Sequence, residues 1–168
     1  MSHAEVSEVW PRDGRIVIRG TIISPNAGSA AGWRLRMVSR EREQQQPGRR
    51  KRALDRVRAL AHRSPRFPAV ITLPVSVEQT KFEAVIGLQT LAPSEPLPRE
   101  LWDLYLVPSE NKGSALRLGR HLDDMPGKKN IVVFPKQRVD EPGRLSIRPY
   151  YTDGDHLAIR CLRSGEEQ

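Results

Sequence analysis

The sequence predicts an all-β protein, an immunoglobulin-like or fibronectin-like antiparallel β-sandwich that carries one inserted short basic helix. Three observations lead to this fold class. Apolar and polar residues alternate in many short segments, 14 prolines and 12 glycines interrupt the chain, and the strand-like segments recur at the spacing of a sandwich. Because 168 residues suit one core, we predict a single domain over residues 1–168, with residues 41–66 as the insertion.

The first two strands form a predicted hairpin. Asp13-Gly14 separates residues 6–10 from residues 15–22, and this dipeptide predicts a turn with positive φ. Gly20 interrupts the second of these segments, which predicts a bulge or a kink. The alternation is strict in residues 33–37, so we expect the tryptophan, leucine and methionine of this segment to face the core.

The insertion follows this third strand. Residues 44–48 predict a break, and after it aliphatic residues recur at helical steps: Ala53, Leu54, Val57, Leu60 and Ala61. Eight basic residues and a single acid lie between Arg49 and Arg66, so most of the formal net charge of +8 is located here. Because an isolated helix of this length is marginal, we predict that the segment is helical or flexible.

The rest of the chain contains seven further segments with strand character, at residues 71–77, 82–88, 102–106, 115–119, 131–134, 145–151 and 156–162. Pro74 places the first of them at an edge or a bulge. Asp153-Gly154 predicts a second hairpin turn with positive φ, and three prolines in residues 92–98 predict an extended crossover. The predicted core consists of Trp33, Leu73, Ile86, Trp102, Leu104 and Ile159.

Two sets of residues are candidates for binding an anionic polymer or a partner. The first belongs to the insertion, whose charge can attract nucleic acid, anionic lipid or an acidic polymer, or can simply form a solvated loop: Arg49, Arg50, Lys51, Arg52, Arg56 and Arg58. The second combines rings and arginines on strands: Tyr105, Arg148, Tyr150, Tyr151 and Arg160. An exposed ring beside arginines can contact a sugar phosphate, although tyrosine is also an ordinary strand residue. Adjacent strand residues face opposite sides, so we expect one of Tyr150 and Tyr151 to be exposed.

No arrangement of residues predicts an enzyme, a cofactor or a metal site. The sequence has neither a glycine-rich phosphate loop nor a two-histidine metal spacing. His121, Asp123 and Asp124 could hold a hard cation or act in acid–base chemistry, but they precede a turn signature, and a structural role fits them better. Cys161 alternates with apolar residues, which predicts a core position rather than a nucleophile, and as the single cysteine it excludes an intramolecular disulfide.

Several motifs together carry a family resemblance. They are LWDLYL at residues 101–106, LRLGRHLDD at 116–124 with Lys128-Lys129, RPYYT at 148–152 and HLAIR at 156–160. In these stretches, and in outline in the earlier strands, the chain resembles the accessory β-sandwich domains attached to actinobacterial glycosyltransferases and glycerophosphotransferases that make teichoic-acid-like wall polymers. The resemblance covers most of the chain except residues 41–66. It implies a companion of a catalytic module, without a reaction or catalytic residues of its own.

The sequence departs from that family in its basic insertion and in carrying no transferase domain. We therefore expect a detached, non-enzymatic accessory or adaptor module that binds an acidic glycan or a transferase partner. The alternative is a nucleic-acid-binding or regulatory protein that acts through residues 49–66. No apolar run is long enough to span a bilayer and no signal peptide is evident, so we expect a cytoplasmic location, with a peripheral position at the inner face of the membrane as a variant. Pairing of exposed strand edges leaves a dimer open.

Overall fold

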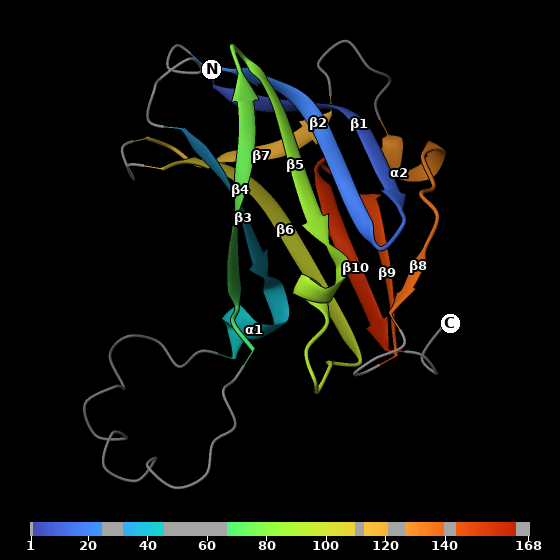
Figure 1. Ribbon diagram of the computed structural model, residues 1–168. Coiled ribbons are helices and arrows are strands. Elements are labelled where there is room, and N and C mark those ends of the chain that lie inside the picture. Colours follow the sequence, from blue (N-terminus) through green and yellow to red (C-terminus); the bar gives the residue numbers. More distant parts are fainter. Residues whose placement is uncertain are drawn as a thin grey trace, which may run out of the picture.

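Ten strands form one continuous sheet in the part of the chain that the structure, a computed structural model, describes: residues 2–24, 32–45, 67–109, 113–120, 127–139 and 144–163 (Figure 1). In chain order the strands are β1 (His3–Arg12), β2 (Arg15–Ile23), β3 (Trp33–Ser39), β4 (Val70–Glu78), β5 (Lys81–Gly87), β6 (Arg99–Pro108), β7 (Leu116–Arg120), β8 (Gln137–Val139), β9 (Leu145–Tyr151) and β10 (Leu157–Arg163). Within the same residues lie three short helices, α1 (Arg40–Gln44), the 3-10 helix η3 (Leu88–Leu91) and α2 (Lys128–Ile131). The prediction of an all-β protein is confirmed.

Seven of these strands close into a barrel, which the sequence does not predict. Their order around the ring is β3, β4, β5, β2, β1, β7 and β6, and β6 pairs back onto β3. The neighbours in the ring are antiparallel except β1 and β7, which run parallel. Because β2 lies three strand steps from both β3 and β6, the layer that contains β1, β2 and β5 lies across the barrel from the layer that contains β3 and β6 (Figure 1).

The strands β8, β9 and β10 extend the second layer beyond the barrel. One edge of β6 pairs with β3, whereas its other edge pairs first with β10 and then, at Tyr105 and Leu106, with β7. β9 and β8 follow β10, each antiparallel to its neighbour. The outward side of β6, β10 and β9 is therefore one continuous surface.

The core lies between the two layers. Trp33, Ile86, Trp102, Leu104 and Ile159 are buried as predicted, and Leu73 is partly buried against them. Full burial of side chains of this kind contributes about 1.5–3 kcal/mol each. The inward faces of the alternating strands thus supply the driving force for this fold.

The two predicted hairpin turns have different outcomes. Asp13 and Gly14 both have positive φ, at 54° and 72°, as the sequence predicts. In the second hairpin the positive φ belongs to Asp155, at 55°, and not to Asp153 or Gly154. The reason is a turn closed by the Asp155 N–H, which donates to the Thr152 carbonyl at 3.0 Å and leaves Asp155 to reverse the chain.

The strand predicted at residues 131–134 is wrong. α2 ends at Ile131, and the following residues pair with no strand, because Pro135 has no N–H to donate to a ladder. Val132 and Phe134 nevertheless pack against the core, so their alternation reflects burial without strand pairing. The strand of this region is β8, a few residues later.

Pro74 lies where β4 passes from one layer to the other. β4 pairs with β3 up to Pro74 and with β5 from Val75 onward. At such a changeover one side of the strand is unpaired, which suits a residue without an N–H. The changeover between partners therefore accounts for the proline, in place of the edge strand or bulge that the sequence predicts.

The bulge predicted at Gly20 lies in the neighbouring strand instead. The register of β1 on β2 shifts after Val6, opposite Gly20, and Ser7 is the extra residue. A β-carbon on Gly20 would overlap the Glu5 carbonyl oxygen and lie within 2.6 Å of the Phe82 ring. Glycine is required here because backbone and ring approach closely.

The helix predicted in the insertion lies outside the described residues. The residues that lead into the insertion are described. α1 begins directly after β3, and Ser39 caps its first turn through Oγ, which accepts from the Arg42 N–H at 3.3 Å. No helix in the described ranges has the length and apolar character needed to cross a membrane.

Candidate functional site

Four of the five strand residues that the sequence selects lie on the outward side of β6, β9 and β10. Arg148 lies directly opposite Arg160, and Tyr150 lies opposite Ala158, which in turn lies opposite Asp103. Tyr105 is two residues beyond Asp103 and therefore shares its side of the sheet. We define the arginine–tyrosine face as the surface formed by Arg40, Arg99, Asp103, Tyr105, Arg117, Arg148, Tyr150 and Arg160.

Tyr151 does not belong to this face. Its side chain is 4% exposed, and its ring lies 5.9 Å from that of Phe134, between centroids. Tyr150 is half-buried and points to the outer side. The register of β9 thus identifies Tyr150 as the outward residue of the pair and places Tyr151 in the core.

Arg148 and Arg160 form a pair of like charges on adjacent strands. Among the described residues, neither guanidinium has an acidic partner or a hydrogen bond. Burial, followed by the charges of Arg148 and Arg99, lowers the pKa of Arg160 below its ordinary value, although the side chain stays positive at neutral pH. Like charges directly opposite each other destabilise a sheet, so this pair favours an anion between or above the two guanidiniums.

Tyr150 lies within this positive group. The guanidinium carbon of Arg160 is 5.9 Å from the centre of its ring. Burial raises the pKa of Tyr150, while the nearby charges of Arg40, Arg99 and Arg160 lower it in part. The phenol is therefore neutral at pH 7 and can donate its O–H to an anionic oxygen.

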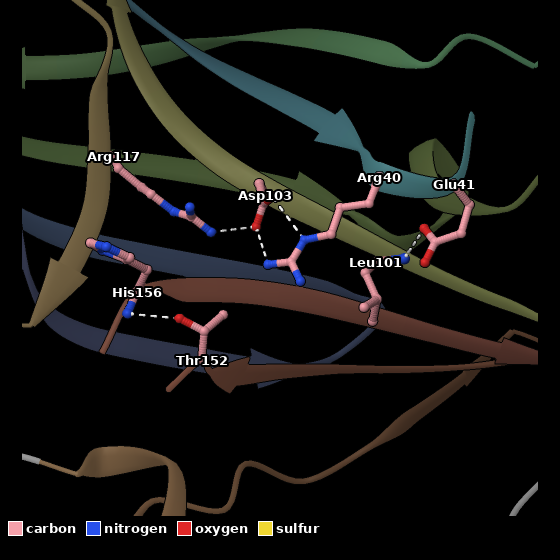
Figure 2. Close-up of polar contacts among 7 residues, drawn as sticks. All are labelled: Arg40, Glu41, Leu101, Asp103, Arg117, Thr152 and His156. Carbon is pink, nitrogen blue, oxygen red and sulfur yellow. Dashed lines mark hydrogen bonds and ion pairs between the residues drawn. The ribbon is translucent and has the colours of Figure 1, made fainter. Parts of the chain in front are cut away.

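Asp103 joins two arginines at the centre of the face (Figure 2). Arg40 donates to it through both Nε, at 2.9 Å, and Nη2, at 2.7 Å, and Arg117 donates through Nη2 at 2.5 Å. These hydrogen bonds raise the pKa of Arg40. One carboxylate therefore orients two guanidiniums, and the face as a whole has five arginines and one aspartate.

Tyr105 has a similar arrangement at the other end of the face. The guanidinium carbon of Arg117 lies 5.7 Å from its ring centre, and Arg36 lies opposite it on β3. The ring is half-buried. Both outward tyrosines are thus half-buried with an arginine beside the ring, which leaves less ring surface for a stacked base than an exposed aromatic residue offers.

His156 borders the face beside Arg117 (Figure 2). Its backbone N–H is held by Thr152 Oγ1 at 3.2 Å. Burial and then the charge of Arg117 lower the pKa of His156, so the ring is neutral at pH 7. Within the described residues, His156 Nδ1 and Arg117 Nε are buried and have no hydrogen-bond partner.

The six basic candidates of the insertion lie outside the described residues: Arg49, Arg50, Lys51, Arg52, Arg56 and Arg58. The chain on both sides of them is held at the start of β6. Arg42 binds Glu100 and lies 5.0 Å from the Phe67 ring centre, and Phe67 meets Trp102 edge-on at 6.3 Å between ring centroids. The insertion therefore leaves and rejoins the sheet near Arg99, at one end of the arginine–tyrosine face.

The sequence reasoning missed four members of the face, which are Arg40, Arg99, Asp103 and Arg117. The alternation in β6 could have indicated that Asp103 faces outward with Tyr105. No sequence signal predicts that Arg40 and Arg117 meet it, because their contacts depend on which strands pair with β6.

The sequence also draws attention to a histidine–aspartate cluster and to Cys161. In the described parts of the chain, no group of three or more histidine, cysteine, aspartate or glutamate residues could hold a metal ion. His121, Asp123 and Asp124 lie outside those parts. Cys161 is 1% exposed, and burial raises the pKa of its thiol, so it has the properties of a core residue. No protein-family model and no curated protein matches the chain.

Proposed function

We propose that this protein is a non-catalytic accessory module of cell-wall glycopolymer synthesis, and that it binds a phosphate-bearing, teichoic-acid-like glycan through the arginine–tyrosine face. The observation that supports this proposal best is the cross-strand pair of Arg148 and Arg160 beside Tyr150. A phosphate diester at this position would accept hydrogen bonds from both guanidiniums and cancel their repulsion. The phenol O–H of Tyr150 would add a contact to the phosphate or to the adjoining polyol.

An acidic glycan fits this face better than a nucleic acid. Binding of single-stranded nucleic acid without sequence preference uses aromatic rings with free faces on which bases stack. Here Arg117 and Arg160 lie over the rings of Tyr105 and Tyr150. A sugar phosphate chain needs only charged donors and ring edges, which the face offers. Nucleic-acid binding through residues 49–66 is the alternative that the experiment below distinguishes.

The proposal depends on the two-layered packing and not on an immunoglobulin-like or fibronectin-like strand order, which stays a prediction. It keeps the cytoplasmic location expected from the sequence. A transferase is the alternative partner for this face, since a polymerising enzyme and its accessory module act on the same glycan chain. Binding to the free polymer separates these two occupants.

The first experiment measures binding of the protein to a poly(glycerol phosphate) chain and to a DNA duplex at two salt concentrations. The double variant Arg148→Gln/Arg160→Gln is expected to bind the poly(glycerol phosphate) at least about tenfold more weakly, because each charge-assisted hydrogen bond is worth about 1.5–3 kcal/mol. The salt dependence of its affinity should also become shallower, since fewer charges contact phosphate.

The matched control is Arg15→Gln/Lys81→Gln, which removes the same charge from two exposed side chains on the barrel's other layer. The control is expected to retain the affinity of the unmodified protein. If the two double variants bind equally well, the face is not the site and the attraction is one of net charge. Preference for the duplex would instead support nucleic-acid binding.

A further inference from the structure

The bulge in β1 turns a tryptophan outward on the layer across the barrel from the arginine–tyrosine face. Val6 is buried, and in a regular strand Trp10 would face the same side. Ser7 is an extra residue in the pairing with β2, so the side chains after it change sides and Trp10 is 48% exposed. Bulges of this kind commonly re-aim side chains at functional positions.

The indole of Trp10 is held in place by Arg12, whose guanidinium carbon lies 5.4 Å from the ring centre, and by a polar network. Its Nε1 donates to Glu8 Oε2 at 3.0 Å, and the same oxygen accepts from Arg19 Nη1 at 3.3 Å. Arg19 Nε donates to Glu83 Oε2 at 2.6 Å. Glu8 thus lies beside a fixed aromatic ring, and Arg19 links it to Glu83. The hydrogen bond from Trp10 keeps the pKa of Glu8 below its ordinary value, so that Glu8 is an ionised acceptor.

The same carboxylates line an open concavity of about 440 Å³ between β1, β2, β4 and β5. Its wall also includes the hydroxyl residues Ser7, Thr21 and Ser76. A site of this composition offers hydrogen-bond donors and acceptors on one side and an aromatic surface next to it. These are complementary to a sugar ring, which has an apolar C–H face and hydroxyls at its edge.

A protein partner fits this surface less well. The apolar stripe is one residue wide and runs through Trp10, Val17 and Val85, which lie opposite one another on β1, β2 and β5. Charged residues lie on both sides of it, including the Glu8, Arg19 and Glu83 network. A protein interface would have to desolvate these ions at its centre, where charged residues are depleted. A sugar would instead replace the water molecules around these ions with its own hydroxyl groups.

We infer that Trp10, together with Glu8, Arg19 and Glu83, forms a second binding site that takes a neutral sugar ring. The ring stacks on the face of the indole that Arg12 does not cover, and its hydroxyls bind the carboxylates and the guanidinium. The inference does not depend on the arginine–tyrosine face. The molecule would then hold a glycan at two surfaces of different chemistry, one for its charged parts and one for neutral rings.

The test titrates the full chain with four neutral tetrasaccharides, which are β-1,4-linked N-acetylglucosamine, β-1,4-linked glucose, β-1,3-linked glucose and α-1,4-linked glucose. Binding is measured by calorimetry and by tryptophan fluorescence. Trp33 and Trp102 are 6% and 0% exposed, so a change on binding reports mainly on Trp10. We expect at least one probe to bind at millimolar or lower concentration, and Trp10→Ala to weaken it at least about tenfold, as expected for an anchoring ring.

Further variants keep the inference falsifiable. Glu8→Gln/Glu83→Gln retains the ring but removes both charges, and it is expected to weaken binding less than Trp10→Ala does. Arg148→Gln/Arg160→Gln should bind the neutral probe as the unmodified protein does, which separates this site from the proposed phosphate site. The inference fails if none of the four probes binds at millimolar concentration. It also fails if Trp10→Ala binds them equally or if it dissociates a dimer seen by sedimentation.

Discussion

Gly20 shows how one missing carbon shapes the surface of this protein. Its lack of a side chain lets β1 approach through the Glu5 carbonyl and lets the Phe82 ring fill the core beneath. We expect Gly20→Ala to lower the free energy of unfolding by about 1–3 kcal/mol or more, because overpacking forces backbone and ring apart. Chemical denaturation by urea measures the change.

The control for this residue is another strand glycine. A β-carbon on Gly87 would meet only Thr90 Oγ1, at 3.8 Å, which is an ordinary contact. Gly87→Ala should therefore have a much smaller effect than Gly20→Ala. Equal losses would show that strand glycines matter here through conformational freedom and not through the close approach at Gly20.

At the scale of elements, α1 is fastened to β6 by charged groups inside the fold. Glu100 is 2% exposed and accepts from Ser39 Oγ at 2.6 Å, from Arg42 Nε at 2.5 Å and from Arg42 Nη2 at 3.2 Å. Glu41 adds a further link by accepting from the Leu101 N–H at 2.8 Å. This clamp fixes the chain just before the basic insertion.

Removal of one side of the clamp should destabilise the fold strongly. Arg42→Ala leaves the Glu100 carboxylate buried with Ser39 as its remaining described side-chain donor, and such a change typically costs about 3–5 kcal/mol. Adding Glu100→Gln to Arg42→Ala should recover part of the loss, because the uncompensated charge is gone. Arg36→Ala, at an exposed position of β3, should change stability by less than about 0.5 kcal/mol. Thermal unfolding of the three variants and of the unmodified protein measures these changes. An equal loss of stability in Arg36→Ala would contradict the role of the clamp.

The elements also show what the sequence can and cannot predict. Alternation identifies a strand and its buried side within one segment, which is why Trp102, Leu104 and Ile159 are placed correctly. It contains no information on partners, so neither the closure through β7 nor the meeting of Arg40 and Arg117 at Asp103 could be predicted. For the same reason the choice between adjacent tyrosines needed the register of β9, and the outward turn of Trp10 needed the bulge that Gly20 permits.

At the scale of the whole molecule, the barrel separates two kinds of surface. β8, β9 and β10 widen one layer and gather arginines from five elements there, whereas the layer across the ring presents Trp10 among paired charges. The arginine–tyrosine face carries more positive than negative charge, so its side chains repel one another. The fold itself is stabilised by the burial of apolar side chains in the core. Stability and binding are therefore expected to oppose each other at this face.

This opposition gives a prediction for the thermal stability of the whole protein. Arg148→Gln removes one of two like charges that face each other across β9 and β10, and such pairs change stability by about 0.2–1 kcal/mol. We expect the free energy of unfolding to rise by about 0.5 kcal/mol, a shift of about 1–2 °C in Tm, while the affinity for poly(glycerol phosphate) falls. The gain should shrink at high salt, because screening already weakens the repulsion. Arg34→Gln, at an exposed position of β3 opposite Pro74 on β4 and Val107 on β6, should show no such gain. A lower Tm for Arg148→Gln at low salt would mean that this arginine contributes net stability to the fold, and the case for a ligand-dedicated charge would then fail.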